Sequence, residues 1–471
     1  MSTHRIRDIA HLSPAERVAR GKEARKRVPR SAHARFEPAT DRRDPVALLA
    51  ELDATRMADL VPIRWGRMLA SPFAFYRGAA LLMASDLSGA PESGLYGQVC
   101  GDAHVSNFGI FESPERRQVF DINDFDETLP GPWELDVKRL AASAEVLMRE
   151  RGIEAPQRSA AIAGGVEAYR SAMASLAEMG HMERWYQRVE VDFLLETSAK
   201  FAEKSVTKAV RKSAEKGRQK GSLRALARLT ETVDGQPRFR SEPPLLTPAE
   251  ELLTPEQMER FPAVISDFLA KYRASLPDDR RRLLAGYRFV QIARKVVGVG
   301  SVGSRSWVVL MLGRDEQDPL FLQMKEAYPS VLERYWPKSR YRHRGRRVVE
   351  GQRLMQAAGD IMLGWYGLDG FDGLHHDFYV RQLWDGKASI DLASAPLELL
   401  PRYLRVCNAT LARAHARTFD RIALAAYLGR GDSFDRAIAS FAKAYADTNE
   451  RDHQAALAAE KAGRIKVLRG I

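Results

Sequence analysis

Hydrophobic residues along the chain follow two different periods, and the change between them predicts both helices and strands. Residues 45–84 carry apolar positions at helical spacing, which predicts helices interrupted by two prolines. Residues 93–111 predict a strand, a polar loop and a second strand, and residues 116–133 predict a third strand that enters an acidic loop. Residues 134–230 are rich in Ala, Leu, Glu, Arg and Lys, which favour helix. The first half is therefore predicted to be mostly helical.

The second half changes character after residues 234–248, a proline-rich segment that we interpret as a connector and domain boundary. Apolar runs rich in β-branched and aromatic residues predict strands there, and amphipathic stretches predict helices. The predicted elements are a helix at 255–285, two strands around a glycine-rich turn at 287–313, a strand at 319–327, a helix at 346–365, a strand at 377–384, and helices at 397–417 and beyond. The predicted fold class is α+β, with helix in excess.

Composition and cysteine content exclude several classes of protein. Hydrophobic residues make up 45% of the chain and charged residues 28%, which excludes disordered, collagen-like and disulfide-scaffold chains. Two cysteines, Cys100 and Cys407, are too few for a disulfide framework and fit a reducing compartment. No stretch approaches the ~18 uninterrupted apolar residues of a membrane-spanning helix, and the first residues lack the apolar core of a secretory signal. We therefore expect a soluble cytoplasmic protein without a membrane partner.

The net charge of +12 at pH 7 raises the question of a polyanionic partner. Two segments hold much of the excess: residues 1–43, with twelve Arg or Lys against five Asp or Glu, and the run from Lys204 to Arg228. Such runs are usually solvated faces or tails, although they also attract nucleotides and nucleic acids. No zinc-finger spacing or aromatic-studded RNA motif accompanies the charge. Residues 1–43 are interpreted as a basic arm with little order, and nucleic acid is not the expected partner.

Asp and Asn residues gather in the two polar loops of the first strand group. Residues 101–107 read GDAHVSN, and residues 121–127 read DINDFDE. Asp102 can accept a hydroxyl proton, while the Asn107 carbonyl and a carboxylate of the second loop offer the hard oxygens that Mg²⁺ prefers. Four carboxylates in seven residues repel one another unless a cation or a buried base neutralises them. The alternative is a structural cluster of Asx turns around two hairpins.

A glycine-rich segment at residues 298–303 reads GVGSVG, a spacing used by dinucleotide-binding folds and by kinases. A dinucleotide-binding loop opens into a helix, whereas the next segment here, SWVVLML at 306–312, predicts a strand. Two strands joined by glycines form the flap that covers the ATP phosphates in kinases. A plain hairpin turn is the alternative. The candidate phosphate-contacting residues are Gly298, Gly300, Ser301 and Gly303.

Lys325 lies among apolar residues on the next predicted strand. Burying its ammonium group is unfavourable without a partner or a phosphate. The helix that follows offers Glu350 as the partner, with Glu333 as the second choice. A strand lysine paired with a helix glutamate holds the α- and β-phosphates of ATP in kinases. The alternative is a lysine that is simply solvated at a strand end.

Together these residues resemble the protein-kinase-like superfamily, especially its aminoglycoside-phosphotransferase branch. That branch carries a loop of the form H-G-D-x-H-x-x-N and then a metal-binding D-F-D, and this chain reads CGDAHVSN and then DFD. Cys100 stands where the branch has its leading His, so the resemblance does not say how the loop backbone is braced. The resemblance implies catalytic roles for Asp102 and His104 and metal binding by Asn107 and Asp124, with Asp121 and Asp126 close enough to share or replace Asp124.

The whole chain also resembles the bacterial family catalogued as domain of unknown function 2252. The segments that carry this resemblance are GDAHxxNFG and FDxNDFDE, and later GxGSxG followed by QxKEA. They belong to a match that covers most of residues 40–455. This resemblance implies no particular substrate.

The motifs occur in an order that differs from the order in kinases. Kinases run from the flap, lysine and glutamate to the catalytic loop and metal-binding Asp, whereas here the loops at 101–126 precede the flap, lysine and helix at 298–350. We therefore expect a two-lobed, kinase-like fold of circularly permuted order, in which the helix ending near His415 leads in space to the catalytic loop. The predicted domains are the arm 1–43, a helical large-lobe part 44–248 with the catalytic loops, a nucleotide-binding small lobe 249–390, and helices 391–471 that complete the large lobe.

The resemblance implies an ATP- and Mg²⁺-dependent phosphotransferase that acts on an unidentified hydroxyl acceptor, either a small molecule or a protein. Asp102 is expected to orient or deprotonate the acceptor, and Lys325, oriented by Glu350, to bind phosphates under the flap. Two alternatives stay open. One is a nucleotide-binding pseudokinase or regulatory scaffold, and the other is a basic polyanion- or nucleic-acid-binding protein whose acidic loops are structural.

Overall fold

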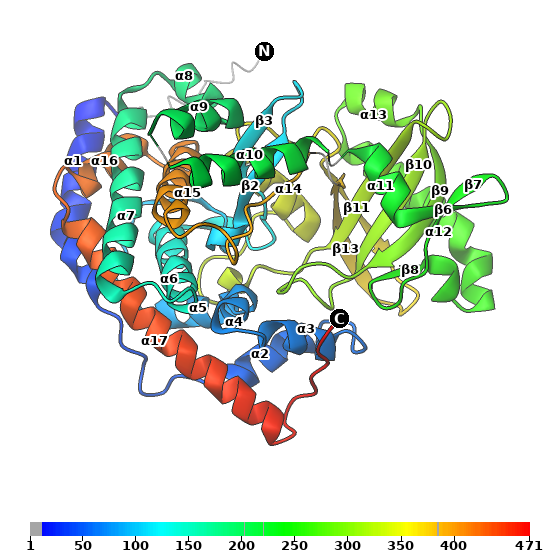
Figure 1. Ribbon diagram of the computed structural model, residues 1–471, viewed down its shortest axis with the longest axis horizontal. Helices are drawn as coiled ribbons and strands as arrows, with labels where there is room; N and C mark the ends of the chain where they lie inside the picture. The colour runs from blue at the N-terminus through cyan, green and yellow to red at the C-terminus, as the bar shows by residue number, and fades with distance from the viewer. Residues whose placement is uncertain (1–11, 202, 220, 384–385) are drawn as a thin grey trace, which may run out of the picture.

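The computed structural model describes residues 12–201, 203–219, 221–383 and 386–471. Figure 1 shows a helical part at the left and a part built around a six-stranded sheet at the right. The fold class is α+β, as predicted. The chain builds most of the helical part first, then the sheet part, and returns to the helical part with its last helices. Segments far apart in the sequence therefore meet where the two parts face each other.

The N-terminal segment contradicts the prediction of a basic arm with little order. Helix α1 (Pro14–Arg27) begins with a capping box, which satisfies backbone donors in its first turn. Gly21 packs against α16 (Arg421–Leu428) so closely that a Cβ atom there would lie 2.0 Å from a carbonyl oxygen of α16. The hydrophobic pattern did not reveal this contact because a glycine makes it. The remainder of the prediction, for residues 1–11, lies outside the described residues.

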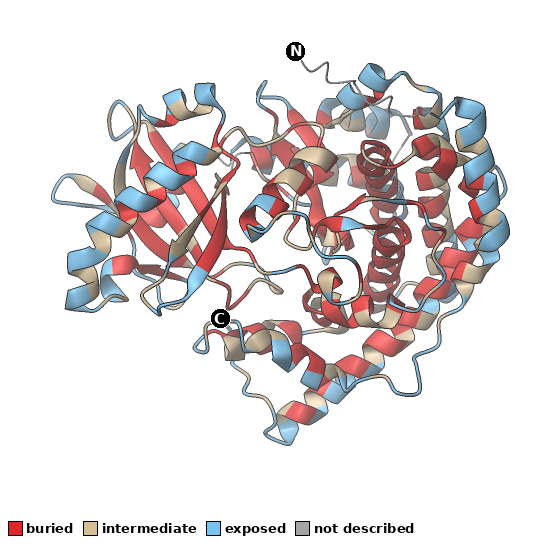
Figure 2. Ribbon diagram, turned by 180° about the vertical axis from the view of Figure 1, so that it is seen from behind, coloured by how far each residue is buried: buried red, intermediate tan, exposed pale blue. Residues whose placement is uncertain are grey.

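Helix α6 (Glu134–Glu150) is the centre of the helical part, and every residue from 134 to 148 is buried. Figure 2 shows the same concentration of buried residues in the middle of the helices. The charged side chains on this helix need partners, because an unpaired charge is strongly disfavoured in the interior. The long helices that pack around α6 are α7 (Ala155–Glu178), α15 (Leu399–Ala416) and α17 (Ser433–Lys461), and short helices that precede α6 in the chain also contact it.

Residues 45–87 form short helices, as the hydrophobic pattern predicted. Pro62 and Pro72 each lie at the first or second position of a helix, where proline is tolerated because that N–H has no helical partner. These helices lie between the helical part and the glycine-rich loop of the sheet part. They are α2 (Pro45–Asp53), α3 (Val61–Met68), α4 (Pro72–Gly78) and α5 (Ala80–Leu87).

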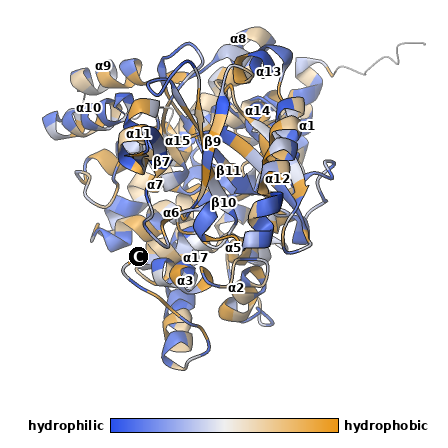
Figure 3. Ribbon diagram, turned by 90° about the vertical axis from the view of Figure 1, so that its right-hand side faces the viewer, coloured by the Kyte–Doolittle hydropathy of each residue, from blue (hydrophilic) through white to orange (hydrophobic). Residues whose placement is uncertain are grey.

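The basic run from Lys204 to Arg228 is helical, and most of its charges face solvent. Helix α10 (Lys204–Arg218) buries Val206, Ala214 and two other small residues, whereas its lysines are exposed. Figure 3 shows that the outer helices carry both hydrophilic and hydrophobic residues, as amphipathic surface helices do. Its neighbours along the chain are α8 (His181–Tyr186), α9 (Val191–Phe201) and α11 (Ser222–Leu229).

Two small antiparallel sheets carry the polar loops that the sequence singled out. Strand β1 (Tyr96–Val99) pairs with β4 (Leu129–Pro132), and β2 (Phe108–Glu112) pairs with β3 (Gln118–Ile122). A short strand, β5 (Val189–Glu190), extends the second pair. The loop between β1 and β2 and the loop between β3 and β4 thus leave the same group of strands.

The larger sheet is antiparallel throughout and has the strand order β12-β13-β11-β10-β9-β8. Part of the segment predicted as a connector belongs to it, because β8 pairs with β9 at the edge of the sheet, so the sheet starts before the predicted boundary at residue 249. The preceding hairpin consists of β6 (Thr230–Val233) and β7 (Gln236–Phe239). The six strands are β8 (Leu246–Pro248), β9 (Arg288–Lys295), β10 (Ser306–Leu312), β11 (Pro319–Glu326), β12 (Gly364–Asp369) and β13 (His375–Gln382).

Two helices cover the larger sheet in different ways. Helix α12 (Pro255–Ser275) packs beside β12 on the side away from the helical part, followed by α13 (Asp278–Leu284). Helix α14 (Arg344–Met355) lies between β13 and the polar loops. A Cβ atom at its Gly345 would meet the β13 backbone at 2.1 Å, and one at Gly351 would meet Thr128 at 2.3 Å. These glycines allow α14 to join the two parts of the molecule closely. Among the helices of the described residues, none combines the length and the apolarity needed to cross a membrane.

Candidate functional site

A cavity of about 140 Å³ brings together the segments that the sequence analysis selected. The two polar loops of the small sheets form one side of it, and the glycine-rich loop between β9 and β10 forms the other, although nearly 200 residues separate them in the chain. The predicted site residues that line this cavity are Asp102, His104, Asn107, Asp124, Asp126, Gly298, Gly300 and Ser301.

The loop from 101 to 107 is held in a tight conformation by its own hydrogen bonds. The backbone N–H of His104 and the side-chain amide of Asn107 both donate to the Asp102 carbonyl, at 2.8 and 2.7 Å. Gly101 has φ +81°, and a Cβ atom there would lie 2.4 Å from a backbone oxygen of Glu127, so this position requires glycine. Because the amide nitrogen of Asn107 is used within the loop, its carbonyl oxygen is the atom it can offer to a cation.

Asp136 of α6 braces the loop backbone at Cys100 and Gly101. Its carboxylate accepts hydrogen bonds from the backbone N–H groups of Cys100 and Gly101, at 2.8 and 2.9 Å. His415 Nε2 of α15 lies 3.0 Å from the same carboxylate, and the other ring nitrogen, His415 Nδ1, lies 2.8 Å from the hydroxyl of Tyr169 on α7. The Cys100 N–H group and the His415 imidazole are buried and the Gly101 N–H group is partly buried, so the carboxylate satisfies groups with little access to water. The brace therefore comes from α6, α7 and α15, not from the side chain that precedes Gly101.

The carboxylate of Asp102 is fixed by Arg139, which lies one helical turn after Asp136. Arg139 Nε donates to Asp102 Oδ1 at 2.7 Å, and a second nitrogen of Arg139 donates to the Tyr76 carbonyl. Burial raises the pKa of Asp102 to about 6, even though Arg139 acts in the opposite direction. The carboxylate is thus both oriented and more basic than an ordinary aspartate. It can accept a proton at neutral pH.

His104 lies beside Asp102, with 3.8 Å between His104 Nε2 and Asp102 Oδ2. Burial and the nearby cations Arg77 and Arg139 hold the pKa of His104 well below its ordinary value, so the imidazole is neutral. Its Nδ1 is buried and has no hydrogen-bond partner in the described part of the chain. A neutral imidazole can donate or accept one hydrogen bond here without adding charge to the cavity.

The three candidate metal-binding aspartates occupy three different environments. Asp121, on β3, forms a buried ion pair with Arg413 of α15 and lines neither of the polar cavities. Asp126 pairs with Lys325 at 2.5 Å and accepts a hydrogen bond from the Tyr379 hydroxyl at 2.6 Å. Asp124 accepts from the backbone N–H of Asp126 and lines both polar cavities. The prediction that Asp121 shares the metal site is therefore wrong, because its strand position directs it into the protein interior.

The contacts of Asp126 with Lys325 and Tyr379 keep its carboxylate ionised. Burial alone would raise the pKa of Asp126, but Lys325 and Tyr379 more than offset this, and the net shift is downward. Burial likewise disfavours the charged form of Lys325, yet Asp126 holds the pKa of this lysine above its ordinary value. Both charges are therefore present at neutral pH. Of the three aspartates, Asp124 is the one whose carboxylate forms no ion pair with any described residue.

The predicted pairing of Lys325 with Glu350 is wrong. Glu350 lies nearest to Arg346 and Arg353 of its own helix, at 3.8 and 3.7 Å. The second choice, Glu333, caps a short 3₁₀ helix instead. The face of α14 that meets the polar loops carries Arg347, so the helix contributes a cation there and the partner of Lys325 comes from the acidic loop.

Arg347 ties α14 to the acidic loop through backbone oxygens. It donates to the carbonyls of Asp126 and Thr128, at 2.7 and 2.6 Å, and to the carbonyl of Tyr328 at 2.8 Å. Its side chain is 2% exposed. A buried guanidinium with several acceptors is a rigid support. Arg347 thus fixes the loop that carries Asp124 and Asp126.

The glycine-rich loop is held from outside by the segment that follows α2. The backbone N–H of Met57 donates to the Gly303 carbonyl at 2.8 Å, and Arg67 donates to the Gly298 carbonyl at 2.7 Å. Gly298 and Gly303 have φ of +73° and +89°, a region that favours glycine. A Cβ atom on Gly300 would lie 3.2 Å from the Arg77 carbonyl. The loop is thus a firmly placed cover over the cavity.

A second polar cavity, of about 310 Å³, opens beside the first and shares Asp124, Gly298 and Ser301 with it. Its walls come from β9, β11, β13 and the segment after β13. Burial lowers the pKa of Lys387 to about 7, and the nearby Arg381 acts in the same direction. A cavity with this charge suits an anion. The basic side chains that line it are Lys295, Lys325, Arg381 and Lys387.

Arg77 is a cation that the sequence analysis did not select. It lines the smaller cavity with Asp102 and Asp124, and its buried Nε has no hydrogen-bond partner among the described residues. Burial lowers the pKa of Arg77, while Asp102 and Asp124 oppose this shift. Arg77 follows an apolar helical pattern with no motif around it, so only the folded chain identifies it. The sequence spacing could have pointed to Asp136 and Arg139, which lie one turn apart on a buried helix.

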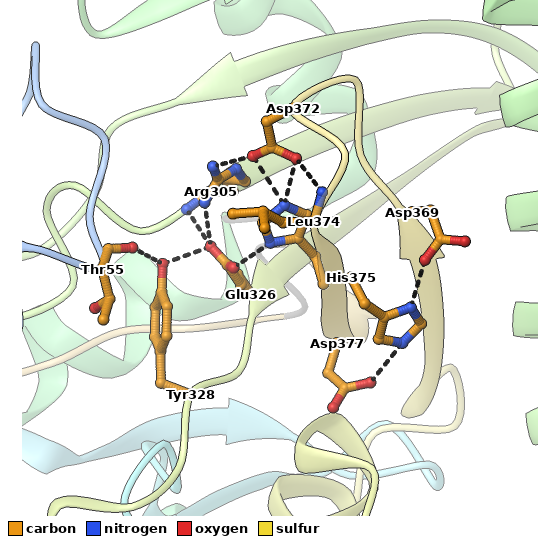
Figure 4. Close-up of polar contacts among 10 residues, drawn as sticks. Thr55, Arg305, Glu326, Tyr328, Asp369, Asp372, Leu374, His375 and Asp377 are labelled. Carbon is orange, nitrogen blue, oxygen red and sulfur yellow. Dashed lines mark hydrogen bonds and ion pairs between the residues drawn. The ribbon is translucent and has the colours of Figure 1, made fainter.

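The wall at the far end of the smaller cavity is a hydrogen-bonded cluster around Glu326 (Figure 4). Glu326 accepts from Arg305 at 3.2 Å and from the hydroxyl of Tyr328. His376 Nδ1 lies 2.7 Å from the same carboxylate, and its Nε2 lies 3.0 Å from Asp372. The Tyr328 hydroxyl also lies 3.2 Å from the Thr55 carbonyl oxygen. The cluster joins the larger sheet to the segment after α2.

Two oxygen ligands for a cation face this site, the Asn107 carbonyl and the Asp124 carboxylate. The described residues contain no group of three or more His, Cys, Asp or Glu side chains able to hold a metal ion by themselves. This donor set fits Mg²⁺ bound together with a phosphate ligand, because Mg²⁺ commonly uses one or two carboxylates, substrate oxygens and water. It does not fit a structural zinc or calcium site.

Comparison with known proteins identifies one relationship. No curated protein and no solved structure is detectably similar to this chain. A family model described as an uncharacterized protein conserved in bacteria (DUF2252) matches residues 56–459. The match spans both polar loops, the glycine-rich loop and Lys325. The chain therefore belongs to the bacterial DUF2252 family.

Proposed function

We propose that this protein is an ATP- and Mg²⁺-dependent phosphotransferase with a kinase-like fold of permuted order. One observation carries the proposal: Asp102, Asn107, Asp124 and the glycine-rich loop line a single cavity. Lys325 and other cations line the cavity that continues from it. A phosphoryl donor, a metal and an acceptor hydroxyl need these groups together.

The order of elements supports the permuted fold. The sheet part runs β9, glycine-rich loop, β10, β11 with Lys325, α14, β12 and β13, which is the order of these elements in a kinase small lobe. The chain then reaches α15, which contacts β1 and β3. The polar loops begin at the ends of β1 and β3, so in space they come after α15, although they precede the sheet part in the sequence. Reconnecting the chain at α15 would restore the kinase order.

The larger cavity is the proposed nucleotide site. The glycine-rich loop covers it at Gly298 and Ser301, and Lys325, Arg381 and Lys387 line it. Cations in a partly buried site bind phosphates more strongly than solvated ones because water screens them less. The γ-phosphate would then lie toward Asp124 and Asp102, where the two cavities join. The basic face of α10 takes no part in this site.

Mg²⁺ bound by the Asn107 carbonyl and Asp124 would neutralise charge on the nucleotide phosphates. Arg77, which lines the smaller cavity and forms no ion pair within the described part of the chain, would act on the transferred phosphoryl group or the acceptor. His104 is neutral and can hold the acceptor by a hydrogen bond. Because the cations and dipoles are already fixed by Asp136, Arg139 and Arg347, little reorganisation is needed when the nucleotide binds.

The chemical step is a transfer of one phosphoryl group. The acceptor oxygen forms a bond to the γ-phosphorus, the bond from that phosphorus to the β–γ bridging oxygen breaks, and ADP leaves with the electron pair. The hydroxyl proton passes to Asp102, whose carboxylate Arg139 orients. The raised pKa of Asp102 suits this role, because a base with a pKa of about 6 is ionised at neutral pH and still basic enough to accept a proton.

A nucleotide-binding pseudokinase is the second candidate, and the Asp126–Lys325 ion pair favours it. A lysine already paired at 2.5 Å has less free charge for phosphate than an unpaired one. In this alternative the same cavities bind the nucleotide without transfer.

The test measures ATP binding and ATP turnover in one set of variants. ATP with Mg²⁺ should raise the melting temperature of the wild-type protein, because a ligand that binds the native state stabilises it, and Asp124→Asn should remove the Mg²⁺-dependent part. Asp102→Ala should abolish ADP formation and keep nucleotide affinity within a few-fold. Glu350→Gln is the matched control, since Glu350 contacts surface arginines, and it should behave like wild type.

The outcomes separate the candidates. ADP formation that depends on Asp102 supports the phosphotransferase. A thermal shift with ATP and Mg²⁺ but no turnover supports the pseudokinase, and the absence of any shift contradicts both.

A further inference from the structure

The larger sheet encloses a cavity of about 380 Å³ on the face turned away from the polar loops. Its floor is formed by β9–β13 and its roof by α12. Met324 of β11 lines it, whereas the neighbouring residues Gln323 and Lys325 line the charged cavity, as the alternation of side chains along a strand requires. This cavity is therefore separate from the proposed nucleotide site.

The walls of this cavity are apolar and strongly aromatic. Phe268 packs against Tyr366, with 4.7 Å between ring centroids, and Tyr366 stacks on Phe378 at 5.1 Å. These contacts fix the rings that face the cavity, so the surface is formed before a ligand arrives. Cavities of this size and lining are typical of small-molecule sites. The aromatic residues that line it are Phe261, Phe268, Trp307, Tyr366, Phe371 and Phe378.

One end of the cavity is polar, and its charges are paired internally. Arg305 donates to Glu326 and Asp372, at 3.2 and 2.6 Å, and His376 lies between the same two carboxylates. Figure 4 shows Arg305 directed at both acids. A ligand carboxylate or phosphate at this end would meet two carboxylates and a guanidinium that is already neutralised. The cavity therefore offers no site for an anion.

We propose that this cavity is a binding site for an uncharged, flat, apolar small molecule of about two fused or linked rings. The stacked aromatic walls would hold its faces, and the paired polar cluster would close the end of the site. The proposal does not depend on the proposed phosphotransferase activity, because no residue that lines either polar cavity also lines this one. Glu326 lines the smaller polar cavity and reaches this one only through its contacts with Arg305 and His376.

The experiment titrates the intact protein with N-phenyl-1-naphthylamine, an uncharged probe whose fluorescence rises in apolar surroundings. We expect saturable binding at one site per chain. The anionic analogue 1-anilinonaphthalene-8-sulfonate should bind at least tenfold more weakly at this site. Val264, on α12, lines the cavity, so Val264→Trp should fill it and weaken probe binding at least tenfold.

The matched control is Ala263→Trp, which adds the same side chain at an exposed position of the same helix, and it should bind the probe like wild type. Val264→Asp is a second variant that keeps the cavity open but places a charge in it, and it should also weaken binding at least tenfold. The proposal is overturned if the probe does not saturate, or if the two Val264 variants bind it as Ala263→Trp does.

Discussion

The two faces of the larger sheet are built from the same strands and stabilised in different ways. On the face toward the helical part, Lys325 depends on Asp126, which comes from a loop 199 residues away in sequence. On the other face, Met324 packs with aromatic residues of the neighbouring strands and α12. The charged face needs partners from the other part of the molecule, whereas the apolar face is completed locally. A function that depends on the charged face of the sheet therefore requires the helical part and the sheet part to be folded together.

The largest effect is expected for Asp126→Ala, which tests whether the charged face depends on a partner from the helical part. The substitution leaves the ammonium group of Lys325, which is 3% exposed, without the partly exposed carboxylate that neutralises it, and leaving a buried charge unpaired costs about 3 kcal/mol. The free energy of unfolding, measured by urea denaturation followed by circular dichroism, should fall accordingly. In the double variant Asp126→Ala with Lys325→Met, much of this loss should be recovered. Equal losses in the single and double variants would show that the pair is not what the charged face depends on.

A smaller effect is expected on the other face of the same strand. Met324→Ala removes a buried apolar side chain, which costs about 2–3 kcal/mol where the surroundings relax in part. Unlike the Asp126 variant, it should leave the ATP-induced change in melting temperature unaltered, because Met324 does not line either polar cavity. A loss of that ATP response in Met324→Ala would mean that the two faces are coupled through β11.

The pH dependence of turnover sharpens the assignment of Asp102. Burial raises its pKa to about 6, and only the ionised carboxylate can accept the acceptor proton. Turnover should therefore rise with pH and reach half of its maximum near pH 6. Because the folded-state pKa lies above the unfolded value, this group makes the fold less stable as the pH rises from about 4 to 6. A rate that is constant from pH 5 to 8 would exclude Asp102 as the base.

The smallest effect is expected on the exposed basic face of α10. Replacing Lys208, Lys212 and Lys216 by Gln should change the free energy of unfolding by less than about 0.5 kcal/mol, because these side chains are exposed. ATP binding should be unchanged. The same variant tests the polyanion-binding alternative: a large loss of salt-dependent affinity for polynucleotides would favour that function over the phosphotransferase.

Much of the candidate site was predictable because its chemistry is concentrated in short segments. Spacing and residue type selected the polar loop, Asp124 and the glycine-rich segment, and most of the selected residues line one cavity. These are Asp102, His104, Asn107, Asp124, Gly298, Gly300 and Ser301, whereas Gly303 does not line it. The partner of Lys325 was not predictable, since carboxylates on a helix and in the acidic loop are chemically equivalent partners for a lysine. Arg77 and Arg347 were missed because a single arginine in a helix has no pattern around it.

The sequence by itself determined the α+β class and most of the helices and strands. It also identified the two polar loops and the glycine-rich loop, because hydrophobic period and turn chemistry are local properties. Only the tertiary structure decided which of three neighbouring aspartates is tied up in an ion pair and which is left to bind a ligand. Asp121 pairs with Arg413, Asp126 with Lys325, and Asp124 faces both cavities. Both ion pairs join side chains about 200 or more residues apart in the chain, and such partners are selected by distance in space, which no local pattern contains.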